Sequence, residues 1–307
     1  MTRTHIPVLL EESIDYLVTK TNGVYFEATL GFGGHTEKIL SRLGKKGSIV
    51  STDVDQYAFD YCKNKFNNED RIKLYNFNFS LIDVIAKIES LEFFDGVLAD
   101  IGVSSYQLDN AAAGFSYSTK SELDLRLDKN LQKTAADFIN NESEDTIAKI
   151  IFEYGEEKNS RKIARKISEF RKINRIETTD ELKEIISLVT NPRYLTKTLS
   201  RVFQALRIHV NDELAVLKSF LENAVSVLAK GGRLVVISYH SLEDRIVKEF
   251  FKYENLTCVC PPDAPICTCG KVKRLNIITR KPIAPSEIEK QNNKRARSAK
   301  LRVAERV

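Results

Sequence analysis

The chain has 307 residues, enough to bury a full core and to form more than one domain. Its 42% hydrophobic and 29% charged residues, with a net charge of +5, are ordinary for a soluble protein. No apolar run approaches the roughly 20 residues of a membrane span. The start lacks the long apolar segment of a secretory signal, so we expect a cytoplasmic protein whose five cysteines are reduced.

Strands alternate with helices towards both ends of the chain. Runs rich in β-branched and apolar residues predict the strands, and F-D-G-V-L-A-D is so continuously apolar that we place it centrally in a parallel sheet. The alternation predicts a doubly wound, Rossmann-like α/β sheet. The predicted strands are 24–29, 48–53, 71–77, 94–100, 231–238, 275–280 and 299–304.

The middle of the chain follows a different pattern. Between Gln107 and Val210 the sequence keeps helical periodicity and contains no convincing strand. A loop of that length inside a compact domain is improbable, so we predict an inserted all-helical domain of residues 107–210. The alternative is a set of helices packed on the sheet. Residues 1–106 and 211–307 then form one discontinuous domain.

A glycine-rich loop, A-T-L-G-F-G-G-H-T (28–36), joins the first predicted strand to a predicted helix. It lacks the third glycine of the dinucleotide motif G-x-G-x-x-G, because Thr36 stands there. It is not a P-loop either, since Gly34 is followed by His35. The loop therefore indicates a ligand other than a pyrophosphate, with a tight turn that binds nothing as the alternative.

Asp53 ends the second predicted strand, where an acidic side chain can accept both hydroxyls of a ribose. A ribose site without a pyrophosphate loop suggests S-adenosylmethionine rather than NAD. Asp55, two residues later, is the alternative ribose ligand.

A second loop, within F-D-G-V-L-A-D-I-G-V-S-S-Y-Q-L-D (94–109), leaves the fourth strand at the carboxyl edge, where open α/β sheets bind ligands. Asp100 should face the ammonium or sulfonium region of the cofactor, because a carboxylate that ends a buried strand needs a partner. Ser104 and Gln107 can reach a base, although capping of a helix is the alternative for the serine.

Six blocks, in order from His5 to Arg306, together resemble the bacterial 16S rRNA cytosine-N4-methyltransferase family, the MraW family. They read H-I-P-V-L-L-E-E, T-L-G-F-G-G-H-T, D-I-G-V-S-S-Y-Q-L-D, R-V-F-Q-A-L-R-I-H-V-N-D-E-L, I-S-Y-H-S-L-E-D-R-I-V-K and R-S-A-K-L-R-V-A-E-R. The resemblance implies a class I methyltransferase fold and S-adenosylmethionine as cofactor. It implies as target a cytidine in the decoding region of 16S rRNA, in the small ribosomal subunit. Carried over by position, the cofactor contacts are Gly33, Gly34, His35, Asp53, Phe79, Asp100 and Gln107.

The chain departs from the usual family pattern in three places that concern RNA loops rather than the cofactor site. Tyr106 stands where proline is common, residues 118–128 lack the usual D-G-P, and residues 292–298 replace N-P-R. Two other functions stay open: an RNA-binding ribosome assembly factor without catalysis, and a dinucleotide-dependent oxidoreductase.

The implied chemistry narrows the catalytic candidates. An exocyclic cytosine amine is a poor nucleophile because its lone pair is delocalised, so positioning and electrostatics should carry most of the rate, with Asp100 as acceptor. Methylation at carbon 5 would need a cysteine nucleophile, and none lies in the loop after the fourth strand. Tyr239 and His240 follow the fifth strand and could contact a flipped nucleotide. Packing, with Ser241 and Asp244 capping the next helix, is the alternative.

Residues 158–175 carry eight Lys and Arg against one Glu. Ile163, Ile167 and Phe170 predict an apolar stripe, which leaves a basic outer face suited to phosphates; a solvated surface is the alternative. We therefore expect the inserted domain to recognise RNA, and we find no sign of an obligatory protein partner. The predicted RNA contacts are Arg161, Lys162 and Arg165, with Arg295 and Arg297 in the C-terminal tail.

Four cysteines occupy two C-x-C pairs within C-V-C-P-P-D-A-P-I-C-T-C (258–269). We predict no metal in the methyltransferase site. For the quartet itself an exposed loop of reduced thiols is one interpretation and structural zinc the other, because four ligands suit zinc while two-residue spacers are commoner. The residues are Cys258, Cys260, Cys267 and Cys269.

Overall fold

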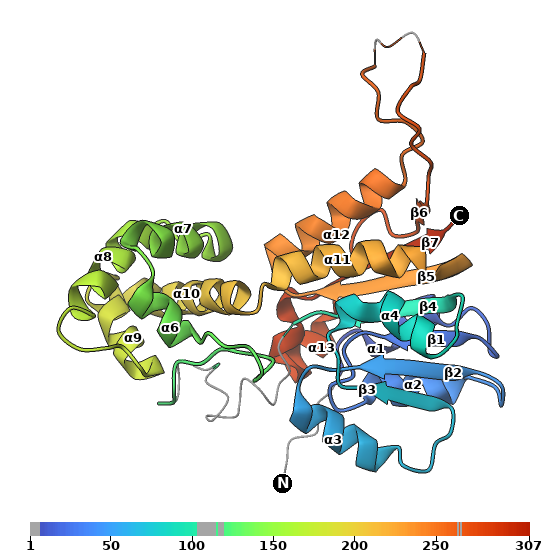
Figure 1. Ribbon diagram of the computed structural model, residues 1–307, viewed down its shortest axis with the longest axis horizontal. Coiled ribbons are helices and arrows are strands. Elements are labelled where there is room, and N and C mark those ends of the chain that lie inside the picture. Colours follow the sequence, from blue (N-terminus) through green and yellow to red (C-terminus); the bar gives the residue numbers. More distant parts are fainter. Residues whose placement is uncertain (1–6, 103–114, 116–119, 263, 265) are drawn as a thin grey trace. The chain divides into compact units, whose positions relative to one another are not determined.

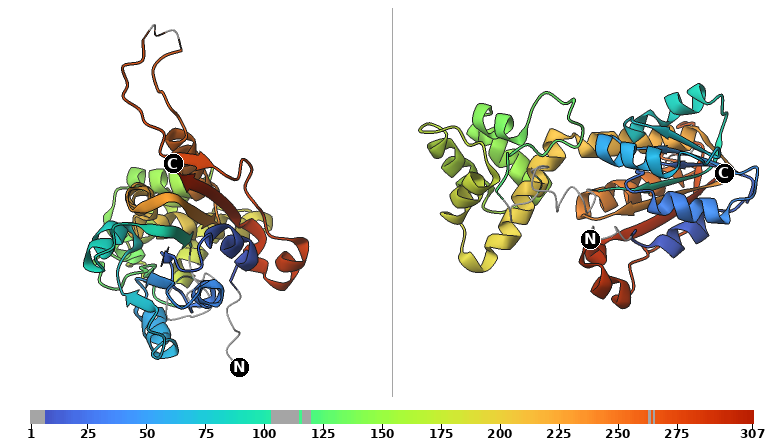
Figure 2. Two further views of the ribbon diagram at one scale, coloured as in Figure 1. Left: turned by 90° about the vertical axis from the view of Figure 1, so that its right-hand side faces the viewer. Right: turned by 90° about the horizontal axis from the view of Figure 1, so that it is seen from below.

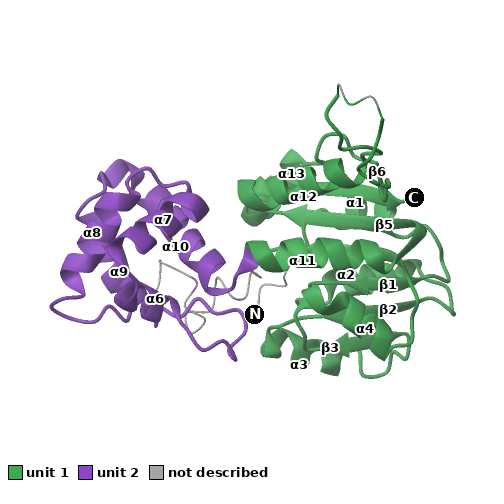
Figure 3. Ribbon diagram, turned by 45° about the horizontal axis from the view of Figure 1, so that its top comes forward, with its two compact units in different colours: residues 1–102, 214–307 green, residues 103–213 purple. Residues whose placement is uncertain are grey.

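The computed structural model describes residues 7–102, 115, 120–262, 264 and 266–307. The chain divides into two compact units, residues 1–102 with 214–307, and residues 103–213 (Figure 3). The first unit, here called the sheet unit, is built around a β-sheet. The second, the helical unit, has helices around a separate core.

The sheet has seven strands in the order β3-β2-β1-β4-β5-β7-β6 (Figure 1). Strands β1 to β5 pair in parallel, whereas β7 runs antiparallel to both β5 and β6. The chain moves outward from β1 to β3 and then returns to β4, so the order reverses between β1 and β4. Ligands of open α/β sheets bind at such a reversal, beyond the carboxyl ends of the strands. The doubly wound, Rossmann-like fold predicted from the sequence is confirmed.

Each strand matches a predicted apolar run, with shifts at the ends. The first strand stops before the glycine loop, and the fifth begins earlier than predicted and passes through two glycines. The strands are β1 Val24–Glu27, β2 Ser48–Thr52, β3 Ile72–Tyr75, β4 Phe94–Asp100, β5 Leu228–Ser238, β6 Leu275–Ile277 and β7 Lys300–Arg306.

Helices cover both faces of the sheet, because alternate strand residues point to opposite sides. Val97 and Ala99 of β4 pack with α4 (Ile82–Ile88), α11 (Glu213–Ser226) and α12 (Ser241–Glu254). Leu98 packs on the other side with α1 (Leu10–Leu17) and α2 (Gly34–Arg42). The remaining helices of this unit are α3 Gln56–Lys65, η1 Phe79–Leu81, α13 Glu287–Asn292 and η4 Lys294–Ser298.

The helical unit has its own apolar core, which includes Ile151 of α7, Ile163 of α8 and Val202 of α10. Two of its helices begin with reciprocal capping boxes, in which Thr134 pairs with Asp137 and Thr178 with Glu181. Within its described residues, β-structure is limited to one isolated bridge. The helices are α6 Ala135–Asn141, α7 Glu144–Gly155, α8 Ser160–Phe170, α9 Thr179–Ser187, η3 Pro192–Tyr194 and α10 Leu195–Val210.

None of the helices in the described part of the chain is both long enough and apolar enough to cross a membrane.

Candidate active site

In the glycine loop between β1 and α2, neighbouring side chains fill the space beside two of the three glycines and leave the space beside the first one open. Gly33 has φ +75°, and a Cβ there would lie 2.6 Å from the Phe66 ring. A Cβ at Gly34 would lie 2.3 Å from Cγ of Pro7. Gly31 also has a positive φ, +51°, but a Cβ there would meet no described atom within 4 Å. Packing therefore requires glycine at the two later positions, and the open backbone is at Gly31.

Asp53, just beyond the end of β2, holds the open side of this loop. Its Oδ2 accepts a 2.7 Å hydrogen bond from the Gly31 amide, and its Oδ1 a 2.9 Å bond from the Asp55 amide. Burial raises the pKa of the Asp53 carboxyl to about 6 although these amides oppose the rise. Asp55 has a different role, because its Oδ1 accepts from the Tyr57 amide as the N-cap of α3. Asp53 thus remains the better placed of the two candidate ribose ligands.

Asp100 ends β4 and joins three elements of the sheet unit. Its amide donates to Oγ1 of Thr29 in the glycine loop at 2.9 Å. Its Oδ1 accepts a 2.7 Å bond from the Tyr239 hydroxyl, and its Oδ2 lies 3.9 Å from Nδ1 of the buried His35. Burial raises the pKa of Asp100 to about 7; the Tyr239 hydroxyl opposes this shift and the charge of Glu243 adds to it. This carboxyl can therefore change protonation state near neutral pH.

Tyr239 and His240 lie directly after β5, as expected, but their contacts are largely internal. Burial raises the pKa of the Tyr239 phenol well above its usual value, so its hydroxyl stays protonated and can donate to Asp100. The capping assignment from sequence was wrong: His240 is the N-cap of α12, in a capping box with Glu243. Asp244 instead forms ion pairs with Arg302 and Lys300, while Ser241 is the first residue of the helix.

Glu27 is a site residue that the sequence reasoning missed. It ends β1, is only 1% exposed, and its Oε2 accepts hydrogen bonds from the hydroxyls of Thr36 and Ser51. Its Oε1 is buried and makes no hydrogen bond with the described residues. Burial raises the pKa of Glu27 to about 8, and the nearby Asp100 and Asp53 add to the rise. The available signal was an acidic residue inside the apolar run V-Y-F-E-A, immediately before the glycine loop.

Phe79 begins η1, after β3, and its ring lies edge-on to that of Phe220 with the centroids 5.0 Å apart. The Phe79 side chain is therefore partly buried in the core, and its exposed part suits a contact with the adenine ring of a cofactor. Ser104 and Gln107, like Tyr106, lie outside the residues that the structure describes.

The basic residues predicted to bind RNA are exposed. Arg161, Lys162 and Arg165 lie on the outer face of α8, whereas Ile163 and Ile167 are buried beneath them. Phe170 was predicted to complete the apolar stripe, but it is 39% exposed because it is the last residue of the helix. In the sheet unit, Arg297 is exposed and Arg295 half-buried in η4, whose Ala296 enters the core.

Three acidic side chains, from the ends of β1, β2 and β4, thus lie at the edge of the sheet that carries the glycine loop. Burial leaves Glu27 largely protonated at neutral pH, so the negative charge of this edge comes from Asp53 and Asp100. Such an edge suits a ligand that carries positive charge and a ribose. The sheet order and this edge define a class I methyltransferase, an enzyme that takes its methyl group from S-adenosylmethionine.

The chain belongs to the MraW methylase family, whose model matches residues 2–307. It is 50% identical over 304 residues to the ribosomal RNA small subunit methyltransferase H of Caldicellulosiruptor saccharolyticus, covering 99% of each chain. The protein of that name from Fusobacterium nucleatum is 47% identical, with 99% of this chain and 97% of that one covered. A solved rRNA methylase of Streptococcus thermophilus aligns at 11% identity and a TM-score of 0.41, over 100% of this chain and 99% of that one.

Proposed function

We propose that this enzyme transfers a methyl group from S-adenosylmethionine to the N4 amine of a cytidine in the decoding region of 16S rRNA, and that it acts on the small ribosomal subunit in the cytoplasm. The names of the relatives support the substrate class, and the resemblance to the MraW family supports the nucleotide. The observation that carries the chemistry is Asp100, a largely buried carboxyl at the switch point of the sheet, bonded to Tyr239.

The residues of the sheet edge fit this cofactor. Asp53 would accept from the ribose hydroxyls, exchanging its present bond from the Gly31 amide. Gly33, Gly34 and His35 would border the amino-acid end, and Phe79 and Gln107 the adenine. When bound, S-adenosylmethionine supplies an electrophilic methyl group on a sulfonium. The acidic edge favours binding of that cation.

Asp100 would act on the cytosine amine. As a carboxylate it can accept a hydrogen bond from the N4 hydrogens and stabilise the positive charge that develops on the nitrogen. Tyr239 holds one carboxylate oxygen, which fixes the direction of the other. The proton released after methyl transfer can be taken by this carboxylate, because its pKa of about 7 is close to neutral pH.

The alternative chemistry, methylation at carbon 5, would need a reactive thiolate. Among the described residues, the cysteine next to the glycine loop is Cys62, whose thiol donates to the Gly31 carbonyl at 3.3 Å. Burial raises the pKa of Cys62 to about 12, so it is protonated at neutral pH and a poor nucleophile. This favours transfer to nitrogen.

We assign the helical unit to RNA recognition, through the exposed basic face of α8. Exposed arginines and lysines bind phosphates without reading sequence, which suits a surface that positions a large RNA. Arg295 and Arg297 would add contacts from the sheet unit.

Mass spectrometry of 16S rRNA from a deletion strain tests the proposal. We expect the loss of one N4-methylcytidine, its full return with the wild-type gene, and a smaller return with Asp100→Asn. Loss of a 5-methylcytidine instead would contradict the chemistry. An unchanged set of modified nucleosides would indicate an assembly factor without catalysis.

A further inference from the structure

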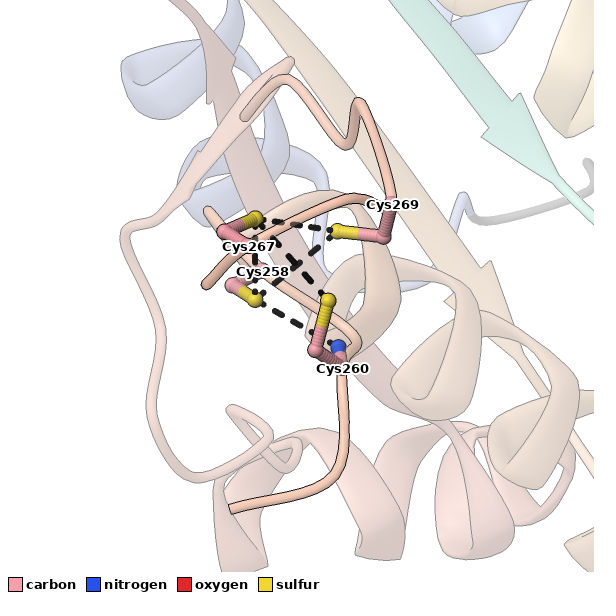
Figure 4. A group of neighbouring side chains, drawn as sticks. All are labelled: Cys258, Cys260, Cys267 and Cys269. Atoms are coloured by element: carbon pink, nitrogen blue, oxygen red, sulfur yellow. Dashed lines mark hydrogen bonds between the residues drawn. The ribbon is translucent and has the colours of Figure 1, made fainter. Parts of the chain in front are cut away.

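The four cysteines of the loop between α12 and β6 converge on one point, although they come from two separate C-x-C pairs (Figure 4). Their sulfur atoms all lie within 4.8 Å of one another. The individual Sγ–Sγ distances are 3.4 Å for Cys258–Cys267, 3.6 Å for Cys267–Cys269, 3.8 Å for Cys258–Cys269 and 3.9 Å for Cys260–Cys267.

These distances match one tetrahedral ion. Four sulfurs at about 2.3 Å from a zinc ion lie about 3.8 Å from each other. They are too long for disulfides, whose S–S bond is about 2.05 Å. They are also too short to enclose a cluster of several irons and sulfides. We propose that Cys258, Cys260, Cys267 and Cys269 form a structural site for a single Zn²⁺.

Backbone amides in the loop already point at the sulfurs. The Val259 amide donates to Sγ of Cys269 and the Cys260 amide to Sγ of Cys258, both at 3.4 Å. Such donors stabilise thiolates, which bind metal as the deprotonated form. Four thiolates and no open position define a closed site, so the ion has a structural rather than a catalytic role.

The loop has little else to hold its shape. It runs outward from the end of α12 and returns to β6 (Figures 1 and 2). Among its described residues from Thr257 to Gly270, hydrogen bonding between backbone groups is limited to one turn, from the Ala264 amide to the Pro261 carbonyl. None of these described residues is buried in the core, and Ile266 is 75% exposed. A long segment without a core needs another source of stability, which a bound ion supplies.

The base of the loop is fixed independently of the cysteines. Glu254, fully buried at the end of α12, accepts from Nε of Arg274 at 2.5 Å and from Nζ of Lys271 at 3.2 Å. The Arg274 amide also donates to the Glu254 carbonyl. Loss of the ion should therefore release the outer part of the loop and leave the rest of the sheet unit folded.

Metal analysis of the full chain, purified without chelators, tests the site. We expect about one zinc per chain, and a tetrahedral thiolate spectrum when Co²⁺ replaces zinc. The double variant Cys258→Ser/Cys260→Ser should lose the metal. Cys62→Ser is the matched control, because Cys62 lies in α3 and should leave the metal content unchanged.

Limited digestion with elastase, a serine protease that cleaves after small apolar residues and uses no catalytic metal, gives a second measurement on the wild-type chain. The outer part of the loop offers Val259 to this protease, so a strong chelator should speed cleavage there while the other fragments persist, and added Zn²⁺ should reverse the effect. The site is refuted if the reduced wild-type chain contains no zinc and takes up neither Zn²⁺ nor Co²⁺. Iron in place of zinc, or disulfides within the quartet under reducing conditions, would equally overturn it.

Discussion

The carboxyl edge of the sheet and the outer face of α8 use charge in opposite ways. At the sheet edge the ionisable groups are acidic and largely buried: Glu27 is 1% exposed and the Asp100 side chain 14%. On α8 they are basic and exposed, with 73% of the Arg165 side chain accessible. Burial raises the pKa values of the acids, which makes each one sensitive to its neighbours. Exposed bases are screened by salt and act by their number.

The difference predicts how each region fails. A buried carboxylate acts in a low-dielectric environment, so the loss of one such charge should change chemistry or cofactor binding by a large factor. A basic surface loses affinity in smaller steps, and the loss depends on salt. Mutations at the sheet edge should therefore affect turnover or cofactor binding, and mutations on α8 should affect RNA binding.

The largest effect is expected for Asp100→Asn. The amide keeps the shape but removes the negative charge that faces the cytosine amine and the cationic donor. Methyl transfer at saturating S-adenosylmethionine should fall by about 10²–10³-fold, while binding of small subunits is retained. In single-turnover assays of the folded variant, wild-type rates would remove Asp100 from the mechanism.

The next largest effect is expected for Asp53→Ala. A lost charge-assisted hydrogen bond to the ribose should cost on the order of 1.5–3 kcal/mol of cofactor binding, roughly 10- to 150-fold in Kd. Asp55→Ala is the matched control: it removes the N-cap of α3, which should cost about 1 kcal/mol of stability and leave the cofactor affinity unchanged. Calorimetry showing the reverse order would reassign the ribose to Asp55.

A smaller effect is expected from reversing charge on α8, by changing Arg161, Lys162 and Arg165 to Glu. Binding of 16S rRNA should weaken, and the slope of log K against log salt should flatten by about one per lost contact. Cofactor binding should not change.

The control for this variant reverses three exposed lysines in the sheet unit, Lys45, Lys46 and Lys87, which gives the same change in net charge. Equal losses in the two triple variants would mean that net charge, and not the face of α8, governs binding.

The sequence predicted the parts of the sheet unit that depend on local pattern. Runs rich in β-branched and apolar residues predicted all seven strands, and the place of Asp53 followed from its position at the end of the second strand. That packing requires glycine at positions 33 and 34 was not predictable from the sequence. Phe66 and Pro7 fill the space where side chains would lie, and both are distant from these glycines in the sequence. Long-range packing of this kind leaves no periodic signal.

Two features, one in the active site and one in the cysteine loop, depend on contacts that the spacing of residues in the sequence does not predict. The hydroxyl of Tyr239 reaches Asp100 across 139 residues of sequence, because β5 pairs beside β4 in the sheet. The convergence of the four cysteines is similar: their spacing left zinc and free thiols as alternatives, and the sulfur positions favour zinc. In both cases the residue types indicated a possible function from the sequence, whereas the contacts between their atoms depend on the path of the backbone in the fold.

The smallest effect is expected for Tyr239→Phe, which should shift the pH dependence of the rate. Asp100 must be ionised to stabilise the positive charge on the amine and to take its proton, so the rate should rise as the pH increases through its pKa of about 7. The Tyr239 hydroxyl lowers that pKa, so its removal should raise it further. The other ionisable groups near Asp100, namely His35, Glu27 and Glu243, stay in place. We expect the acidic limb of the rate profile to move to higher pH by about one unit.

The rate should recover at alkaline pH, because the phenyl ring keeps its packing against Gly102. Unchanged rates at every pH would mean that Tyr239 serves packing alone, and an acidic limb that does not move would mean that burial sets the ionisation of Asp100 without the hydroxyl.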